Sequence, residues 1–290
     1  MNDDFKNLTT EKISPKSQRK DLNIKSLIND FIDEYDSITA SMKKNKNKIS
    51  KAVDFFVKTY SSGGNIYFLG AGTSGRLGIL EAAECPPTFG TNPKRIVGII
   101  AGGKSAVFKS KEGAEDSGIN SLDDLMSYSF NSDDLLIGIS ASGKSEYVLS
   151  GIKYAKKIKA PSILISCNQI KNKISDLDIV LNVGPEFISG STRLKSGTAT
   201  KNLLNIITSV SMIRLEKIYK NVMIEISPTT RKLKARLIRN LSFLLNIDQK
   251  LAIKLLEKSK WSIRLGLIMH KMNVSYKISK ILSREISIVE

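Results

Sequence analysis

Histidine and cysteine are scarce in this 290-residue sequence, which has one His, His270, and two widely separated Cys, Cys85 and Cys167. A zinc cage needs about three or four such ligands, so we expect no metal site. A Ser-His-Asp triad would have to depend on His270 alone. Two separated cysteines do not make a disulfide framework, and they favour a reduced, cytoplasmic protein.

Long apolar runs are also missing. No stretch reaches the ~20 apolar residues that a helix needs to span a bilayer. The acidic start of the chain is not followed by the apolar run of a signal peptide. We therefore expect no membrane partner and no export. The hydrophobic fraction of 41% and the charged fraction of 25% are ordinary for a folded globular protein.

Acidic residues are outnumbered by basic ones, 28 to 45, which gives a formal net charge of +17. Such an excess suggests a nucleic acid, a membrane surface or a small phosphate as partner, or simply a solvated basic surface. The sequence has one Trp and no aromatic stacking motif, and its lysines are spread along the chain. We therefore predict no nucleic-acid partner and expect most of the excess charge to be solvated.

The middle of the chain alternates between short apolar runs and helical stretches. The runs are rich in Ile, Val and Leu, as in strands buried on both faces of a parallel sheet. They are Ile66–Leu69, Ile96–Ile100, Leu135–Ile139, Ile163–Ser166 and Ile179–Val183. The helical stretches are Arg76–Glu84, Phe108–Met126, Glu146–Lys157 and Thr200 to about Lys220. This order predicts an α/β fold with a doubly wound, five-stranded parallel sheet.

The two ends of the chain have different patterns. Residues 1–20 are polar, and we expect them to be loose. Apolar residues at helical spacing predict two helices from Leu22 to about Tyr60. After residue 228 the pattern is purely helical, with about four short helices expected. We predict three parts: a polar segment and helix over 1–50, an α/β domain over 51–222 and a small helical module over 223–290.

A glycine-rich loop, residues 70–75 (GAGTSG), follows the first predicted strand. It matches the G-x-G-x-x-G pattern of nucleotide-binding loops in its strand–turn–helix context. However, the acidic residue that holds a ribose about 20 positions later is missing. Arg76 and Leu77 stand where a phosphate-binding Walker A loop needs Lys and Ser or Thr. NAD and ATP therefore have little support, and we predict no cofactor.

A second loop, residues 140–145 (SASGKS), joins the third predicted strand to a helix. Open backbone N–H groups at a helix N-terminus favour a phosphate. Ser145 could simply cap the helix, but capping needs one hydroxyl and this loop has three. We predict that Ser140, Ser142, Gly143 and Ser145 bind the phosphate. If the first and third strands are neighbours, both loops open into one crevice, which suits a sugar phosphate better than a dinucleotide.

These loops resemble those of the sugar isomerase (SIS) domain, a sugar-phosphate-binding α/β fold. Further motifs follow in order: residues 84–90 (ECPPTFG), 101–103 (AGG), 112–116 (EGAED) and 190–199 (GSTRLKSGTA). Together they resemble the N-acetylmuramic acid 6-phosphate etherase family over nearly the whole chain. The resemblance is weakest over 1–50 and 225–290. Leu194 and Ser196 stand where Met and Ala are expected in the family.

The resemblance implies a carbon–oxygen lyase with a SIS-type domain over 51–222. Such an enzyme cleaves the lactyl ether of N-acetylmuramic acid 6-phosphate, giving N-acetylglucosamine 6-phosphate and D-lactate in cell-wall sugar recycling. It is a cytoplasmic homodimer with its active site near the subunit interface, and it needs no metal. Elimination followed by hydration requires a general acid and a general base. With one His in the chain, carboxylates are the natural candidates.

The resemblance places these two catalytic roles on Glu84 and Glu115. Because Pro86 disfavours helical geometry at Cys85, we expect the helix to end near Glu84. The negative end of the helix would raise the pKa of that carboxyl and suit a general acid. Glu115 would take the C2 proton or activate the hydrating water. The division of roles between the two glutamates stays open.

Other residues of these motifs are expected to bind the substrate. Thr73, Ser74 and Gly75 would face the sugar hydroxyls or the N-acetyl group. A second set would bind the lactyl carboxylate, line the subunit interface or form structural salt bridges: Arg193, Lys195 and Thr198.

Three other functions remain open at this point. A sugar-phosphate sensor without enzymatic activity would not need both glutamates. An aldose–ketose isomerase would not explain the ECPP and EGAED motifs together. A nucleic-acid-binding protein is suggested by the net charge alone.

Overall fold

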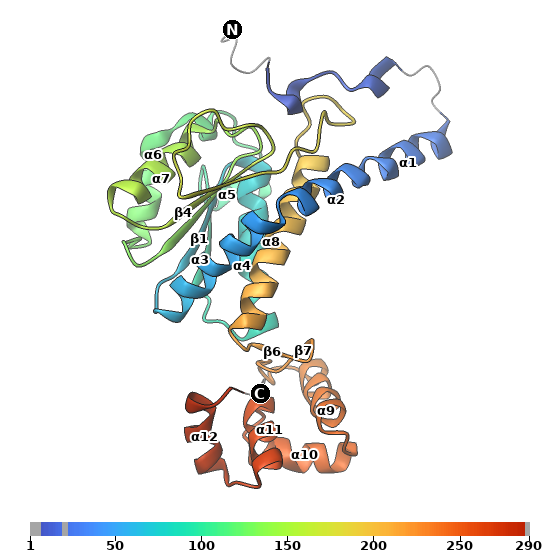
Figure 1. Ribbon diagram of the computed structural model, residues 1–290, viewed down its shortest axis with the longest axis vertical. Coiled ribbons are helices and arrows are strands. Elements are labelled where there is room, and N and C mark those ends of the chain that lie inside the picture. Colours follow the sequence, from blue (N-terminus) through green and yellow to red (C-terminus); the bar gives the residue numbers. More distant parts are fainter. Residues whose placement is uncertain (1–6, 19–22, 288–290) are drawn as a thin grey trace. The chain divides into compact units, whose positions relative to one another are not determined.

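The computed structural model describes residues 7–18 and 23–287, which form two compact units (Figure 1). One unit comprises the chain up to Ala83 together with Lys94–Thr208. The other comprises Glu84–Pro93 and the chain from Ser209 onward. In the part of the chain that the structure describes, no helix is long and apolar enough to span a bilayer.

The first unit is built on a parallel five-stranded sheet with the order β2-β1-β3-β4-β5. The strands are β1 (Ile66–Gly70), β2 (Ile96–Ile100), β3 (Leu135–Ile139), β4 (Ser162–Ser166) and β5 (Leu177–Val180). The winding direction reverses between the adjacent strands β1 and β3, so their carboxyl ends border the natural ligand crevice. The predicted doubly wound α/β sheet is confirmed, and so is the adjacency of its first and third strands.

Helices cover both faces of this sheet. Side chains alternate along a strand, so Tyr67 and Leu69 pack toward α6 (Gly118–Ser127) and α7 (Glu146–Lys157). Phe68 faces the other way, toward α4 (Gly72–Phe89), where a Cβ at Gly78 would lie 2.8 Å from the Phe68 Cβ. Because α4 packs this closely on β1, the glycine-rich residues between the two elements are held at the carboxyl end of the strand.

Several predicted boundaries are wrong. The N-terminal region has three helices where two were expected: α1 (Ile24–Asp33), α2 (Tyr35–Lys44) and α3 (Lys46–Ser61). The single helix expected at Phe108–Met126 is divided into α5 (Ser105–Phe108), the 3-10 helix η3 (Ala114–Asp116) and α6. Gly113 causes one of these breaks, because its φ of +73° interrupts the helical path.

The expected end of α4 near Glu84 is also wrong, because the helix continues to Phe89 with Pro86 and Pro87 inside it. Proline has a φ that suits a helix, so the cost is confined to the missing N–H donors and local crowding. The helix ends instead at Gly90, which has φ +64° and donates its N–H to the Pro86 carbonyl at 3.0 Å.

The second unit contains a hairpin and four short helices. Strands β6 (Ile218–Tyr219) and β7 (Val222–Met223) pair antiparallel. The helices are α9 (Arg231–Leu245), α10 (Gln249–Lys258), α11 (Ile263–Met272) and α12 (Tyr276–Glu285), and each has a side-chain N-cap: Thr230, Asp248, Ser262 and Ser275. The four expected C-terminal helices are confirmed, whereas the hairpin was not predicted.

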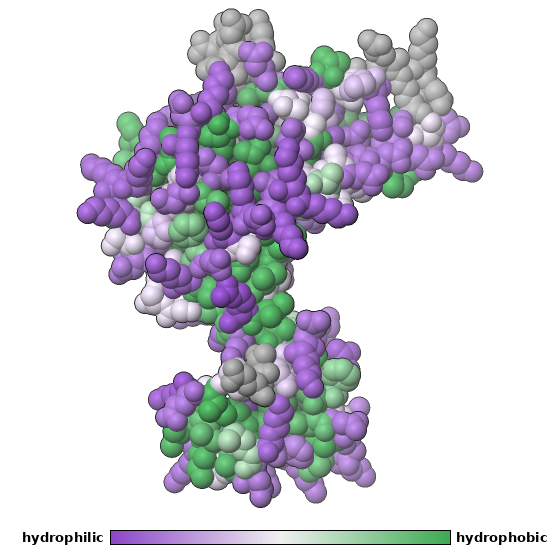
Figure 2. Space-filling view, in the orientation of Figure 1, coloured by the Kyte–Doolittle hydropathy of each residue, from purple (hydrophilic) through white to green (hydrophobic). Residues whose placement is uncertain are grey.

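The N-terminal segment was expected to be loose, but residues 7–18 are hydrogen-bonded to other parts of the first unit; the rest of 1–20 lies outside the described residues. Thr10 and Ser14 are buried. The Ser14 N–H donates to Ser189 Oγ at 3.0 Å, and Thr10 bonds to Asn168. The polar composition of this segment therefore serves specific hydrogen bonds. Elsewhere, hydrophilic residues cover much of the visible surface (Figure 2), as expected for solvated charge.

Candidate active site

A cavity of about 390 Å³ lies at the carboxyl ends of β1 and β3 in the first unit. Thr73 and Ser74 of the glycine-rich motif line it from the first turn of α4, where a loop was expected, and the 140–145 loop contributes Ser140, Ser142 and Ser145. The structure therefore brings the two motifs together in one cavity.

The 140–145 loop is a tight turn held by its own hydroxyls. Ser140 Oγ lies 3.3 Å from Ser142 Oγ and accepts the Ser145 N–H at 3.3 Å. Gly143 has φ +71°, and a Cβ there would lie 2.8 Å from Ser166 Oγ. Gly143 does not line this cavity, and its function in the loop is to permit the turn.

The helix that follows, α7, has no side-chain cap. Ser145 stands at the N-cap position, but its hydroxyl donates to the Glu115 carbonyl at 3.2 Å. Within the described residues, Ser145 thus gives the first N–H groups of α7 no side-chain cap, and Ser145 itself lines the cavity. Simple capping does not explain Ser145, and this helix end is suited to an anion.

Glu115 lies on η3 and lines the same cavity. Partial burial raises the pKa of its carboxyl, and the neighbouring carboxylates of Asp116 and Glu112 act in the same direction. Glu115 therefore keeps its proton to a higher pH than an ordinary glutamate does, which suits proton transfer.

Two other predicted residues lie outside the cavity lining. At Gly75, a Cβ would meet Ile100 Cγ1 at 2.5 Å, so this glycine allows α4 to pack on the sheet. Glu84 is exposed on α4 and belongs to the second unit. Because α4 continues five residues beyond Glu84, to Phe89, the helix-end argument for its pKa does not apply.

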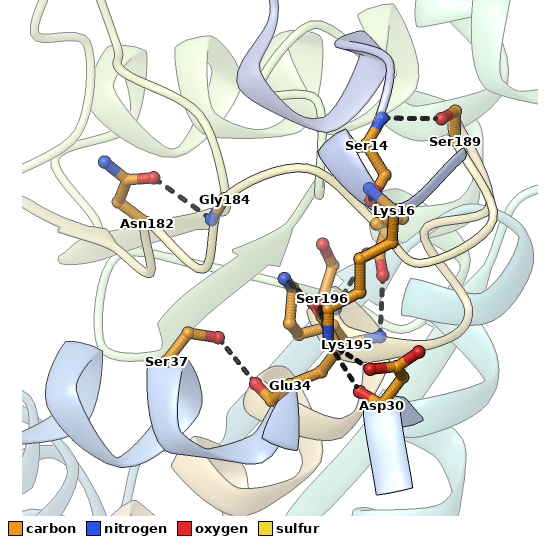
Figure 3. Close-up of polar contacts among 11 residues, drawn as sticks. Ser14, Lys16, Asp30, Glu34, Ser37, Asn182, Gly184, Ser189, Lys195 and Ser196 are labelled. Carbon is orange, nitrogen blue, oxygen red and sulfur yellow. Dashed lines mark hydrogen bonds and ion pairs between the residues drawn. The ribbon is translucent and has the colours of Figure 1, made fainter. Parts of the chain in front are cut away.

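The remaining predicted residues surround a separate cavity of about 140 Å³: Arg193, Lys195 and Thr198. Lys195 is 8% exposed, and its ammonium pairs with the Glu34 carboxylate (Figure 3). Lys16 approaches the same carboxylate at 3.5 Å. Lys195 is thus engaged in an ion-pair cluster, which is the salt-bridging role that the sequence left open.

The start of α8 (Lys195–Arg214) is capped by a side chain that lies nine positions earlier in the sequence. Glu186 is fully buried, and its carboxylate accepts the N–H groups of Lys195 at 2.8 Å and of Ser196 at 2.9 Å. This carboxylate offsets the positive end of the α8 dipole. Unlike the start of α7, this helix end has its N–H groups already occupied.

Four residues with polar side chains line the cavity without having been predicted from the sequence: Glu11, Thr192, Ser196 and Thr200. The Ser196 hydroxyl is fully buried and makes no hydrogen bond within the described residues. The nearby Cys167 thiol donates to the Ser196 carbonyl at 3.9 Å, and burial raises the pKa of this thiol to about 11. The spacing of four between Ser196 and Thr200 could have placed both on one helix face, whereas no motif pointed to Glu11.

The described residues include no cluster of three or more His, Cys, Asp or Glu able to hold a metal ion. The chemistry that the cavity offers comes from hydroxyls, backbone N–H groups and carboxylates. Such an arrangement can bind an anion at the start of α7 and transfer a proton at Glu115.

Comparison with known proteins adds independent evidence. Residues 48–156 match the family described as the glucokinase regulatory protein N-terminal SIS domain. Among solved structures, a putative phosphosugar isomerase involved in capsule formation from Bacteroides fragilis has a TM-score of 0.51 at 19% identity, covering 67% of this chain and 91% of its own. An Escherichia coli CFT073 protein, solved in complex with a ligand, has a TM-score of 0.50 at 17% identity, covering 68% and 94%. These likenesses support the fold.

Sequence relatives are much closer. The N-acetylmuramic acid 6-phosphate etherase of Prochlorococcus marinus (strain MIT 9303) is 42% identical over 92% of this chain and 86% of its own. The protein of the same name from Geobacillus sp. (strain WCH70) is 39% identical over 93% and 92%. Identity at this level over nearly the full length of both chains shows that this chain belongs to the N-acetylmuramic acid 6-phosphate etherase family.

Proposed function

We propose that this protein cleaves the lactyl ether of N-acetylmuramic acid 6-phosphate in the cytoplasm, giving N-acetylglucosamine 6-phosphate and D-lactate for cell-wall sugar recycling. The observation that carries the proposal is the near full-length identity of about 40% to relatives with that name. A cavity with an open helix N-terminus and a carboxyl of raised pKa supports it.

The phosphate of the substrate binds at the 140–145 loop. The uncapped start of α7 supplies N–H donors and positive partial charge, and Ser140 and Ser142 supply hydroxyls. Thr73 and Ser74, in the first turn of α4, bind hydroxyls or the acetamido group of the sugar. One cavity can thus hold both the anionic and the neutral polar parts of one ligand.

The chemistry is an elimination followed by a hydration. In the open-chain sugar the C1 aldehyde acidifies the C2 proton, a base removes it, and the C3–O bond breaks as an acid protonates the departing lactate oxygen. Water then adds at C3. Glu115 serves as one acid–base group, because a carboxyl whose pKa is raised above the usual glutamate value is better matched to proton transfer. Glu84, in the ECPP motif, is the other.

We further propose that the protein works as a homodimer with the active site near the subunit interface. The support is an exposed apolar row on α1, with Ile24, Ile28 and Ile32 exposed by 73%, 52% and 55%. The described part of α1 contributes no buried residue of its own. Such a row, repeated every four residues, is typical of a helix face that another protein surface covers.

The proposal is tested by incubating the protein with N-acetylmuramic acid 6-phosphate in ²H- and ¹⁸O-labelled water. We expect lactate release, with solvent deuterium at C2 and solvent oxygen at C3 of the product sugar. Solvent oxygen in the lactate alone would contradict elimination. Binding of the substrate without lactate release would favour the sugar-phosphate sensor.

A further inference from the structure

The N-terminal segment contributes a carboxylate to the cavity. Glu11, at the end of the 3-10 helix η1 (Thr9–Glu11), lines the cavity together with Glu115. Its Oε2 lies against the backbone of Gly190, where a Cβ would come within 3.2 Å. Within residues 7–18 and 23–287, this carboxylate has no hydrogen-bond or ion-pair partner. It is therefore available to a ligand.

The backbone next to Glu11 is held in place by buried hydrogen bonds. Thr10 is fully buried, and its hydroxyl accepts Asn168 Nδ2 at 2.9 Å. Its carbonyl accepts the Gly190 N–H at 3.2 Å. Asn168 Nδ2 also donates to the Ala141 carbonyl at 2.9 Å, in the phosphate-binding loop. One amide thus ties the segment that carries Glu11 to the 140–145 loop, which also lines the cavity.

We infer that Glu11 binds a neutral hydrogen-bond donor on the sugar, either a hydroxyl or the acetamido N–H. An ionised carboxylate only accepts hydrogen bonds, so it can pair with neither the phosphate nor the lactyl carboxylate of the substrate. Both anions are repelled from this side and attracted to the start of α7. Glu11 therefore orients the sugar with its phosphate toward α7. This inference rests on the proposed function and deepens it.

The test measures binding of N-acetylglucosamine 6-phosphate and of inorganic phosphate by calorimetry. Glu11→Ala should weaken the sugar phosphate roughly ten- to hundredfold, the loss of one hydrogen bond to a charged group. It should leave inorganic phosphate unchanged or bound slightly more tightly. Glu11→Gln, which keeps one acceptor oxygen, should lie between wild type and Glu11→Ala. Glu257→Gln, on the exposed face of α10, controls for the change in net charge.

Thr10→Val tests whether the anchor matters, because it removes the hydroxyl that bonds to Asn168 and keeps the size of the side chain. It should weaken the sugar phosphate less than Glu11→Ala does. Unchanged sugar-phosphate binding by Glu11→Ala overturns the inference. So does equal weakening of both ligands, which would show general damage to the cavity. Wild-type binding of N-acetylglucosamine 6-phosphate without lactate production defeats the proposed function alone, whereas absence of that binding defeats both.

Discussion

Two helices begin at the same cavity, and their N-termini are treated in opposite ways. At α7 the N-cap residue Ser145 directs its hydroxyl to the Glu115 carbonyl and so does not cap the first N–H groups of the helix. At α8 the buried Glu186 occupies the N–H groups of Lys195 and Ser196. One helix end therefore attracts an anion, and the other is already neutralised. The α7 side of the cavity is therefore more electropositive than the α8 side. This difference can orient a ligand that has one anionic end.

The two helix ends also differ in the groups that lie beside them. The hydroxyl that leaves α7 open is the one that holds the Glu115 backbone, so the anion site and the carboxyl of raised pKa are built together. At α8, Glu186 neutralises the helix end beside Ser196 and Thr200, two residues that line the cavity. Neutral parts of a ligand fit best there.

The largest effect is expected from Glu115→Gln, which removes proton transfer at the α7 side of the cavity. Lactate release should fall roughly 10²- to 10⁴-fold, because this is the usual contribution of a general acid or base. Binding of N-acetylglucosamine 6-phosphate, measured by calorimetry, should change little, since the amide keeps the size of the side chain. Turnover within a few-fold of wild type would remove Glu115 from the chemistry.

Glu186→Ala should remove the asymmetry between the two helix ends. Loss of this buried cap should lower the free energy of unfolding by about 2–4 kcal/mol, measured by urea denaturation. The opened α8 N-terminus should then bind an anion, so inorganic phosphate should raise the melting temperature more than it does in wild type. An equal phosphate effect in both proteins would show that the cap does not govern anion binding.

The same comparison shows what the sequence could predict. The bounds of α7 are predicted without error, because the serine loop and the apolar periodicity are local signals. The start of α8 is predicted five residues late, since its cap, Glu186, acts from nine positions upstream through the tertiary fold. The end of α4 was predicted wrongly from Pro86, because the helix ends at Gly90. Helix bounds that depend on neighbouring residues can be predicted from the sequence, whereas a bound that depends on a cap brought in by the tertiary fold cannot.

The candidate site divides in the same way. The serines of the 140–145 loop follow β3, and Thr73 and Ser74, in the first turn of α4, follow β1, so topology alone brings them together. Glu11 reaches the cavity through hydrogen bonds between residues more than 150 positions apart. No periodicity or spacing in the sequence encodes such a contact, so the segment that carries it looked merely polar.

A smaller effect is expected from Glu112→Gln, which acts on Glu115 through charge. The Glu112 carboxylate helps to raise the pKa of Glu115, although burial is the larger cause and remains. Removing this charge makes deprotonation of Glu115 easier, so its pKa should fall. The limb of the pH–rate profile that reports Glu115 should therefore move to lower pH, whether Glu115 acts as acid or as base. A shift to higher pH, or none, would contradict this electrostatic coupling.

The smallest effect is expected from Ser196→Ala, on the neutral side of the comparison. The Ser196 hydroxyl is buried and has no hydrogen bond among the described residues, so removing it should leave the free energy of unfolding unchanged or slightly higher. Because the hydroxyl is buried away from the ligand, KM and kcat should both stay close to the wild-type values. The matched variant Ser142→Ala, at the α7 end, should weaken inorganic phosphate, whereas Ser196→Ala should not. If both variants weakened phosphate equally, the two helix ends would not differ in the way that their capping indicates.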